Sequence, residues 1–463
     1  MSSTSSSPSS CSLASTCSSN DSQIPERYCS SYIPTPSCAL HEDLQPKIIQ
    51  LFQNTWPGTK TAHIRIKKFW PTGGHNRIIR INVKAKTKAK SPRQDTADGV
   101  VEHTSGMSGI DITGVQEDKL APGRYMLRFP YHDKHCWMEY EVAIISFLNT
   151  HFPLAPVPKI VNHSLTSENE LGLRYMIQTR LPGSTVQDVY RTLNTTQKIT
   201  FAWDFGCVLK ELGSKSWPCS GDLNPNSDVN DPSFLPPDIP SIKPRCSKGE
   251  LSKIQQPQKP QTTLQYILST FERQYSRTNE SACSPFHASR FPKIATALAE
   301  LGLLNDEGNY IVHHSLHERN ILVDITSSTT ARVGGIIDWD SSSFQPAFMQ
   351  CRPPQWLWGH PFPRSCRDER IRYTQPDAKD KQSIRNAFVW AVGERWMRLA
   401  YTPEYRIARV VLLKGINGFE EGECGCQWAK NTLEKWNAMR PEYAVETGCC
   451  EKDGKESCFR QYC

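Results

Sequence analysis

Apolar and polar residues alternate in two neighbouring stretches of the first half of the chain, "HIRIKKFW" and "RIIRINVKAK". This alternation predicts two half-buried strands, and the turn "PTGGHN" between them predicts a hairpin. "RYMLRFP" and "LRYMIQTRLPG" predict two further strands. Between those two, "MEYEVAIISFLNTHF" places Val142, Ile145 and Leu148 on one face of a helix, which the prolines of "FPLAPVPK" end.

After Gly183 the spacing of the apolar residues becomes helical. "TTQKITFAWDFGCVLKELG" predicts a helix with Thr195 or Thr196 as the cap at its start and Gly213 at its end. More helices are predicted over "TLQYILSTFERQY", "KIATALAELGLL", "AFVWAVGERWMRLAY" and "EYRIARVVLLKGI". Among them, "NILVDI" and "ARVGGIID" predict a second hairpin with the turn "TSSTT".

The pattern therefore predicts an α+β fold of two lobes, with a ligand in the cleft between them. Residues 46–180 form a small strand-rich N-lobe, and residues 181–440 form a larger helical C-lobe. The Ser- and Pro-rich residues 1–45 are expected to be disordered, as is an insert near 214–262. Residues 441–463 form a Cys-containing tail.

Composition and the lack of certain segments argue against several classes of protein. The start of the chain has neither the basic nor the apolar segment of a secretory signal, and no apolar run is long enough to span a membrane. Seventeen cysteines in 463 residues do not suggest a secreted disulfide scaffold. A formal charge of +7 does not by itself indicate nucleic-acid binding. We expect a cytoplasmic protein without a membrane or nucleic-acid partner, and its protein partners stay open.

The second predicted hairpin carries the candidate chemistry. Asn320 stands at the start of its first strand and Asp338 at the end of its second. Pairing the two strands brings both residues to the same end of the hairpin. Amide and carboxylate oxygens suit Mg²⁺, so Asn320 and Asp338 are candidate metal ligands. Phosphoryl transfer needs such ligands, a cation on the phosphates and a group that orients the attacking hydroxyl.

At these residues the sequence resembles the aminoglycoside phosphotransferase family, which has a protein-kinase-like fold. The family has a His-x-Asp loop, an Asn five residues after the Asp, and a hairpin that ends in Ile-Asp-Trp-acid. The matching residues are His313-His314-Ser315, Asn320 and Ile337-Asp338-Trp339-Asp340. The resemblance implies that Mg²⁺ and ATP or GTP bind between the lobes, and that a small hydroxyl-bearing molecule accepts the phosphoryl group. It leaves the acceptor open.

The resemblance also suggests roles for residues of the N-lobe. Gly73 and Gly74 would lie in the loop that covers the phosphates, although they also fit an ordinary hairpin turn. Arg128 would contact the phosphates and Glu141 would pair with it, although each also fits a solvated surface position. The link between the lobes, with Gln178, would hold the nucleotide base by its backbone.

Ser315 stands where the family has its catalytic aspartate, and His313 would brace the same loop. A serine hydroxyl cannot accept a proton near neutral pH, so the general base is expected to be missing. Histidine side chains ordinarily titrate near neutrality, but neither His314 nor His317 occupies the matching position. The sequence thus predicts a nucleotide-binding protein that transfers phosphoryl groups weakly or not at all. The alternative is a non-catalytic, pseudokinase-type binding or scaffold protein.

Overall fold

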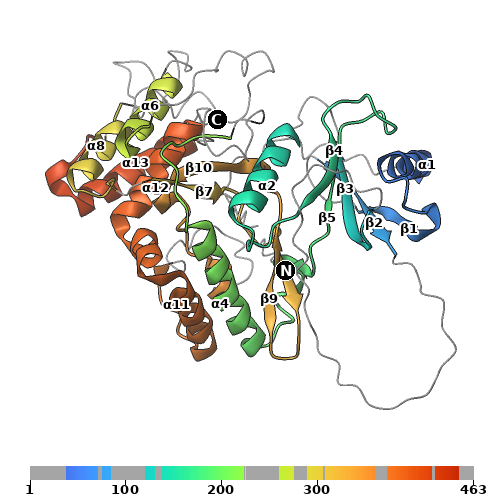
Figure 1. Cartoon of the computed structure of the whole chain (residues 1–463). Coiled ribbons are helices and arrows are strands. Elements are labelled where there is room, and N and C mark those ends of the chain that lie inside the picture. Colours follow the sequence, from blue (N-terminus) through green and yellow to red (C-terminus); the bar gives the residue numbers. More distant parts are fainter. Residues whose placement is uncertain are drawn as a thin grey trace, which may run out of the picture.

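The computed structural model has two lobes (Figure 1). The residues that it describes are 38–70, 76–84, 120–130, 138–223, 225, 260–275, 289–305, 308–359, 373–419 and 423–447. None of the helices in these ranges is long and apolar enough to cross a membrane. The predicted glycine loop residues Gly73 and Gly74 lie outside the described ranges.

The N-lobe contains a five-stranded antiparallel sheet with the strand order β1-β2-β3-β5-β4. Its strands are β1 (Ile64–Trp70), β2 (Asn76–Val83), β3 (Gly123–Pro130), β4 (Ile160–Ser164) and β5 (Tyr175–Thr179). The four predicted strands and the pairing of β1 with β2 are confirmed. The edge strand β4 was not predicted, because its residues IVNHS show no clear alternation.

Two helices flank this sheet. The helix α1 (Cys38–Thr55) lies on its outer side, where Ile48 and Phe52 pack with Ile79 and Leu127. The helix α2 (Met138–His151) lies on the side of the C-lobe and shares the larger core. The prediction of disorder up to residue 45 is wrong for residues 38–45. The Ser- and Pro-rich composition upstream, and Pro46 within α1, obscured a helical apolar stripe that begins at Leu44.

The C-lobe is built mainly of helices, and all those predicted are present. Its long helices are α4 (Thr195–Leu212), α6 (Thr263–Tyr275), α8 (Phe291–Glu300), α11 (Lys379–Tyr401), α12 (Pro403–Asn417) and α13 (Glu423–Met439). Short helical turns are α3 (Val186–Val189), α9 (Gln355–Trp358), η1 (Thr61–His63) in the N-lobe, η3 (Trp339–Ser341), η4 (Ala347–Met349) and η5 (Pro441–Tyr443). Helices α4 and α11 pack so closely that a Cβ at Gly206 would stand 2.6 Å from the Cβ of Ala391.

The start of α4 is capped differently from the prediction. Asn194, and neither Thr195 nor Thr196, is the N-cap residue. Its side chain accepts a hydrogen bond of 2.9 Å from the backbone N–H of Gln197. The side chain of Gln197 accepts one of 3.1 Å from the N–H of Asn194 in return, which completes a capping box. Gly213 follows the end of the helix as predicted.

Two antiparallel pairs of strands form the part of the C-lobe at the cleft. The predicted hairpin of β8 (Ile321–Ile325) and β9 (Ala331–Ile336) is confirmed, and β6 (Ser184–Thr185) adds a third strand to it. The pair of β7 (Asn309–His313) and β10 (Ser342–Pro346) was not predicted. Its two strands flank the β8–β9 hairpin in the sequence, so no local turn signal marks their pairing.

The predicted disordered insert near 214–262 begins too early. Trp217 forms a β-bridge with Asn309, and Gly221 forms one with Phe344. The ring of Trp217 also lies 5.2 Å from that of Phe344. Residues 214–223 are therefore part of the C-lobe, because Leu223 is buried in its core and the partly buried Trp217 packs against that core. Residues 226–259 of the insert lie outside the described ranges.

Gly183 joins the lobes with a backbone that a side chain would not tolerate. Its φ is +88°, and a Cβ there would stand 2.1 Å from the carbonyl oxygen of Val323. Gly172 also has a positive φ, +65°, but no atom lies within 4 Å of its Cβ position. We expect Gly172→Ala to cost about 1 kcal/mol from backbone strain alone. Gly183→Ala should cost a further 1–3 kcal/mol or so, from the steric clash.

Equilibrium unfolding in urea measures both variants. Gly172→Ala serves as the control for the positive φ, so the difference between the two reports the clash at the junction of the lobes. Equal losses of stability in the two variants would contradict the packing described for Gly183.

Candidate functional site

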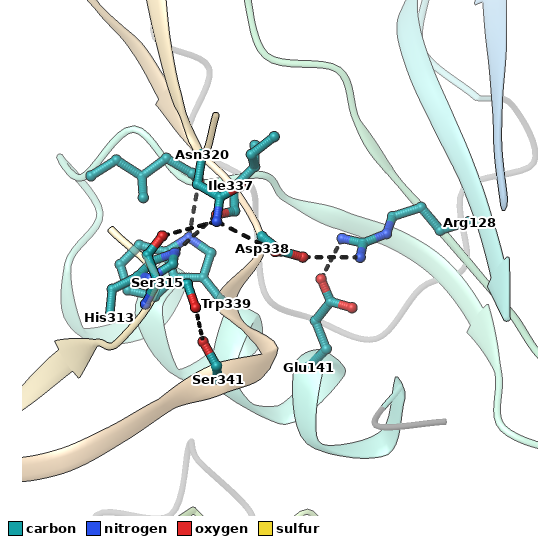
Figure 2. Close-up of polar contacts among 10 residues, drawn as sticks. Arg128, Glu141, His313, Ser315, Asn320, Ile337, Asp338, Trp339 and Ser341 are labelled. Carbon is teal, nitrogen blue, oxygen red and sulfur yellow. Dashed lines mark hydrogen bonds and ion pairs between the residues drawn. The ribbon is translucent and has the colours of Figure 1, made fainter. Parts of the chain in front are cut away.

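Asp338 lies at the centre of the site, between β9 and the turn η3 (Figure 2). Its backbone has φ 70° and ψ 53°, and it is the one non-glycine residue with a positive φ among those described. Asp tolerates this left-handed conformation better than most residues. Its side chain is 46% exposed. The fold thus holds an accessible carboxylate in an unusual conformation, which is a common feature of functional sites.

Asn320 and Asp338 lie together, as the hairpin prediction required. The N–H of Ile337 donates a hydrogen bond of 2.9 Å to the carbonyl of Asn320, which fixes the two strand ends. The Asn320 amide Nδ2 donates to the Ser315 carbonyl at 2.9 Å and to Asp338 Oδ2 at 3.4 Å. Because Nδ2 makes these bonds, the amide oxygen of Asn320 is left to act as an acceptor beside the carboxylate.

The oxygens of this pair fit a magnesium ion. Mg²⁺ prefers oxygen ligands and, when it binds with phosphates, takes only one or two carboxylates from the protein. Within the described ranges, no group of three or more His, Cys, Asp or Glu side chains could hold a metal. A dedicated cage of protein ligands is therefore not formed by these residues, while a site shared with phosphates would need only Asn320 and Asp338.

Arg128 of β3 and Glu141 of α2 form a buried ion pair next to Asp338. Arg128 is 7% exposed and Glu141 is 2% exposed. Arg128 Nη1 donates a hydrogen bond to Glu141 Oε1, and its Nη2 lies 3.9 Å from Asp338 Oδ1. The pairing predicted from the resemblance is thus present, and Arg128 links α2 of the N-lobe to the β9 end in the C-lobe (Figure 2).

Burial and charge act in opposite directions on this pair. The pKa of Glu141 is raised to about 7, mainly by burial and also by the carboxylates of Asp340 and Asp338, while the charge of Arg128 opposes the shift. Burial lowers the pKa of Arg128, but Glu141, Asp338 and Asp340 more than offset this, so its pKa is raised overall. Arg128 therefore stays positively charged, and the charges of more than one carboxylate act on it.

His313 links the backbone of Ser315 to the backbone of Ile337, the residue before Asp338. Its Nε2–H donates to the Ile337 carbonyl at 2.9 Å, and its Nδ1 accepts from the Ser315 N–H at 3.2 Å. These two bonds define the neutral tautomer with the proton on Nε2. Its ring lies 4.7 Å from that of Trp339. The contacts are those expected of a residue that braces the loop.

Among the described residues, the Ser315 hydroxyl forms a hydrogen bond with another hydroxyl and none with a carboxylate. Ser341 Oγ donates to Ser315 Oγ at 3.1 Å. His314 Nε2 bonds to Ser343 Oγ of β10 at 2.6 Å, and His317 Nδ1 accepts from the Arg319 N–H at 3.3 Å. Both neighbouring histidines are therefore engaged with groups other than the Ser315 side chain.

Three further residues of the site had no predicted role. Ser341 contacts Ser315, and the Asp340 charge acts on both members of the buried ion pair. The Tyr140 hydroxyl donates to the Ser342 carbonyl, and burial followed by the Asp222 charge raises its pKa well above the usual value. The sequence signal for Asp340 was its place in the matched Ile-Asp-Trp-acid run. Nothing local marked Tyr140 or Ser341.

Gln178 lies inside the sheet, opposite Met126 on β3 and Ile160 on β4. Its backbone is therefore part of the strand ladder and not a free edge. Its side chain is buried, and its Oε1 has no hydrogen-bond partner among the described residues. Its proposed contact with a nucleotide base, like the roles of Gly73 and Gly74, stays a prediction.

The chain is similar, at low identity, to many solved structures, and three of them serve as examples. These are the aminoglycoside phosphotransferase APH(4)-Ia in a ternary complex with AMP-PNP and hygromycin B (14% identity, TM-score 0.39, 87% of this chain and 98% of that one), an ethanolamine kinase of Plasmodium vivax (11%, 0.41, 86% and 87%), and ADP-bound APH(2'')-Ib (12%, 0.40, 86% and 96%). No curated protein matches the sequence.

The sequence model of the phosphotransferase enzyme family, APH, matches residues 115–385. This match covers more than half of the chain and includes Arg128, Glu141, Ser315, Asn320 and Asp338. The structure has the small strand-rich lobe and the larger helical lobe that the sequence predicted. The chain therefore belongs to the phosphotransferase enzyme family.

Proposed function

We propose that the protein binds a magnesium–nucleotide complex in the cleft and transfers its terminal phosphoryl group weakly or not at all. The assembly of Asn320, Asp338 and Arg128 around one point is the observation that carries this proposal. Asn320 and Asp338 would hold Mg²⁺, and Arg128 would contact the phosphates. The bound ion would supply the charge that neutralises the phosphates, as in related transfer reactions.

The contacts of Ser315 support the second half of the proposal. A general base in this position would have to accept the proton of an acceptor hydroxyl. Ser315 offers only a hydroxyl, which already accepts a hydrogen bond from Ser341. His314 bonds to Ser343 instead. Phosphoryl transfer has a loose transition state that needs little help from a base, so slow transfer to a small hydroxyl-bearing acceptor is compatible with this site.

A non-catalytic binding or scaffold protein is the alternative function, and the same residues favour it. The buried Arg128–Glu141 pair connects the two lobes through Asp338, so a bound nucleotide would stabilise their closed arrangement without any transfer. ATP consumption that rises when an acceptor is added separates the two functions. Saturable nucleotide binding without ATP consumption in the presence of any acceptor supports the scaffold function.

Equilibrium binding by calorimetry tests the nucleotide site. ATP and GTP are titrated with and without magnesium into the wild type, into Asp338→Asn and into the control Asp324→Asn, which lies on β8 of the same hairpin. We expect magnesium-dependent binding that weakens about tenfold or more in Asp338→Asn, equivalent to about 1.4 kcal/mol, and that is unchanged in the control. Failure of the wild type to bind either nucleotide would refute the proposal and direct attention to protein partners.

A further inference from the structure

One face of the N-lobe sheet carries a group of cations that the site above does not use. We call it the cationic band, and its members are Arg65, Lys67, Arg80, Arg124 and Arg180. They come from three adjacent strands and from the residue that follows β5. The strand register places them side by side in two rows that run across the sheet.

The first row crosses the sheet at one level. Arg65 of β1 stands opposite Asn82 of β2, and Asn82 stands opposite Arg124 of β3. The Arg180 N–H then donates a hydrogen bond of 2.8 Å to the Arg124 carbonyl. In the second row, two residues further along the strands, Lys67 of β1 stands directly opposite Arg80 of β2.

The alternation of side chains determines which face the band occupies. Ile79, Ile81, Tyr125 and Leu127 belong to the core that includes α1, so they point to the outer face. Successive side chains of a strand point to opposite faces. Arg80 and Arg124 therefore point to the other face, which also carries Arg128 on β3. The cationic band is thus a continuation of the cleft side of the sheet.

This arrangement costs stability if nothing binds to it. Like charges directly opposite each other in a sheet are destabilising, and Lys67 and Arg80 form such a pair. Burial, and then the charges of Arg80 and Arg124, lower the pKa of Arg180. Within the described part of the chain, no carboxylate forms an ion pair with Arg65, Lys67, Arg124 or Arg180.

We propose that the cationic band binds a soluble anion with several phosphate groups, at a site separate from the metal end of the cleft. Neighbouring strands are about 4.8 Å apart and alternate residues of a strand about 6.8 Å apart, so the cations form a compact target. Guanidinium groups bind phosphate oxygens in pairs, and a phosphate carries more charge than a carboxylate. A compact, highly charged anion therefore fits better than an acidic peptide.

Lipid headgroups offer the same phosphate chemistry, but the geometry favours a soluble anion. The band lies on the sheet face shared with Arg128 and α2, while α1 covers the opposite, outer face. A flat lipid surface would approach the outer side of the lobe more readily than this one.

Calorimetric titration of the full chain with inorganic tripolyphosphate, without magnesium, tests the proposal. The variant Arg124→Glu/Arg180→Glu is expected to weaken binding about 100-fold, from the loss of two charge-assisted contacts. Lys210→Glu/Lys379→Glu changes the net charge equally at exposed positions on α4 and α11 of the C-lobe, and should change binding less than about threefold, since distant surface charges are screened by salt. Asp338→Asn, which tests the nucleotide site, should leave tripolyphosphate binding unchanged.

Arg124→Gln/Arg180→Gln provides a second variant that relieves repulsion without creating new charges. We expect it to unfold at the same or a higher temperature than the wild type while it loses most of the tripolyphosphate binding. Equal weakening in the band and control variants, or no binding by the wild type, would overturn the proposal. Binding to phosphoinositide-containing vesicles in the absence of tripolyphosphate binding would overturn it in favour of a lipid surface. Tighter tripolyphosphate binding in Asp338→Asn, from the lost repulsion by this carboxylate, together with unchanged binding in the band variant would assign the anion to the nucleotide site.

Discussion

Replacement of Ser315 by aspartate is expected to raise magnesium-dependent ATP turnover by about 10²–10⁴-fold, the usual contribution of a positioned general base. The loop that would carry the new carboxylate is held by its backbone. The Ser315 N–H donates to His313 Nδ1, and its carbonyl accepts from Asn320 Nδ2. The side chain can therefore change while the loop keeps its position. Ser341 Oγ, now the donor to Ser315 Oγ, would donate to the aspartate.

Hydrolysis with water as the acceptor gives a readout that does not depend on the unknown substrate. ADP release is followed for the wild type, Ser315→Asp and the control Ser315→Asn, which has nearly the same shape but cannot accept a proton. A panel of small hydroxyl compounds is then added to each. If Ser315→Asp binds magnesium–ATP like the wild type yet turns over no faster than Ser315→Asn, the missing base is not what limits this protein.

Replacement of Arg128 by leucine is expected to destabilise the fold by about 3–5 kcal/mol, the usual cost of leaving one member of a buried ion pair without its partner. Glu141 is 2% exposed, so water cannot replace the lost guanidinium. Arg174→Leu is the matched control. Arg174 forms an ion pair of 3.2 Å with Glu139, which lies on α2 like Glu141, but the Glu139 side chain is 43% exposed. An exposed pair of this kind contributes at most about 1 kcal/mol.

The loss in Arg128→Leu should depend on pH. The folded-state pKa of Glu141 is raised to about 7 from its ordinary value of 4.5, and removal of Arg128 raises it further. Up to about pH 6 the carboxyl keeps its proton in both folded proteins, so both lose stability equally as the unfolded chains ionise, and the difference between them stays constant. Above about pH 7 the wild-type carboxylate ionises beside Arg128 while the carboxyl of the variant keeps its proton, so the variant loses further stability relative to the wild type. Urea unfolding between about pH 5 and about pH 9 measures this, and a difference that stays constant above about pH 7 would contradict it.

The sequence was a good guide to the candidate site where its residues lie in local elements. Asn320 and Asp338 begin and end one hairpin, so strand pairing alone places them together. The Arg128–Glu141 pair joins β3 to α2, and it was anticipated only through the family resemblance. The contacts of Ser315 with Ser341, and of Tyr140 with Ser342, depend on packing between distant elements and had no local signal.

The same distinction applies to the fold. Periodicity and turn residues act over a few positions, so the sequence by itself determined the strands β1, β2, β3 and β5, the β8–β9 hairpin and the helices α2, α4, α6, α8, α11 and α12. Only the tertiary structure decided that β7 pairs with β10, that residues 214–223 join the core, and that the cations of three strands align in one band. Each of these depends on residues far apart in the chain, whose contacts form only when burial of the shared apolar surface compensates for the entropy of bringing them together.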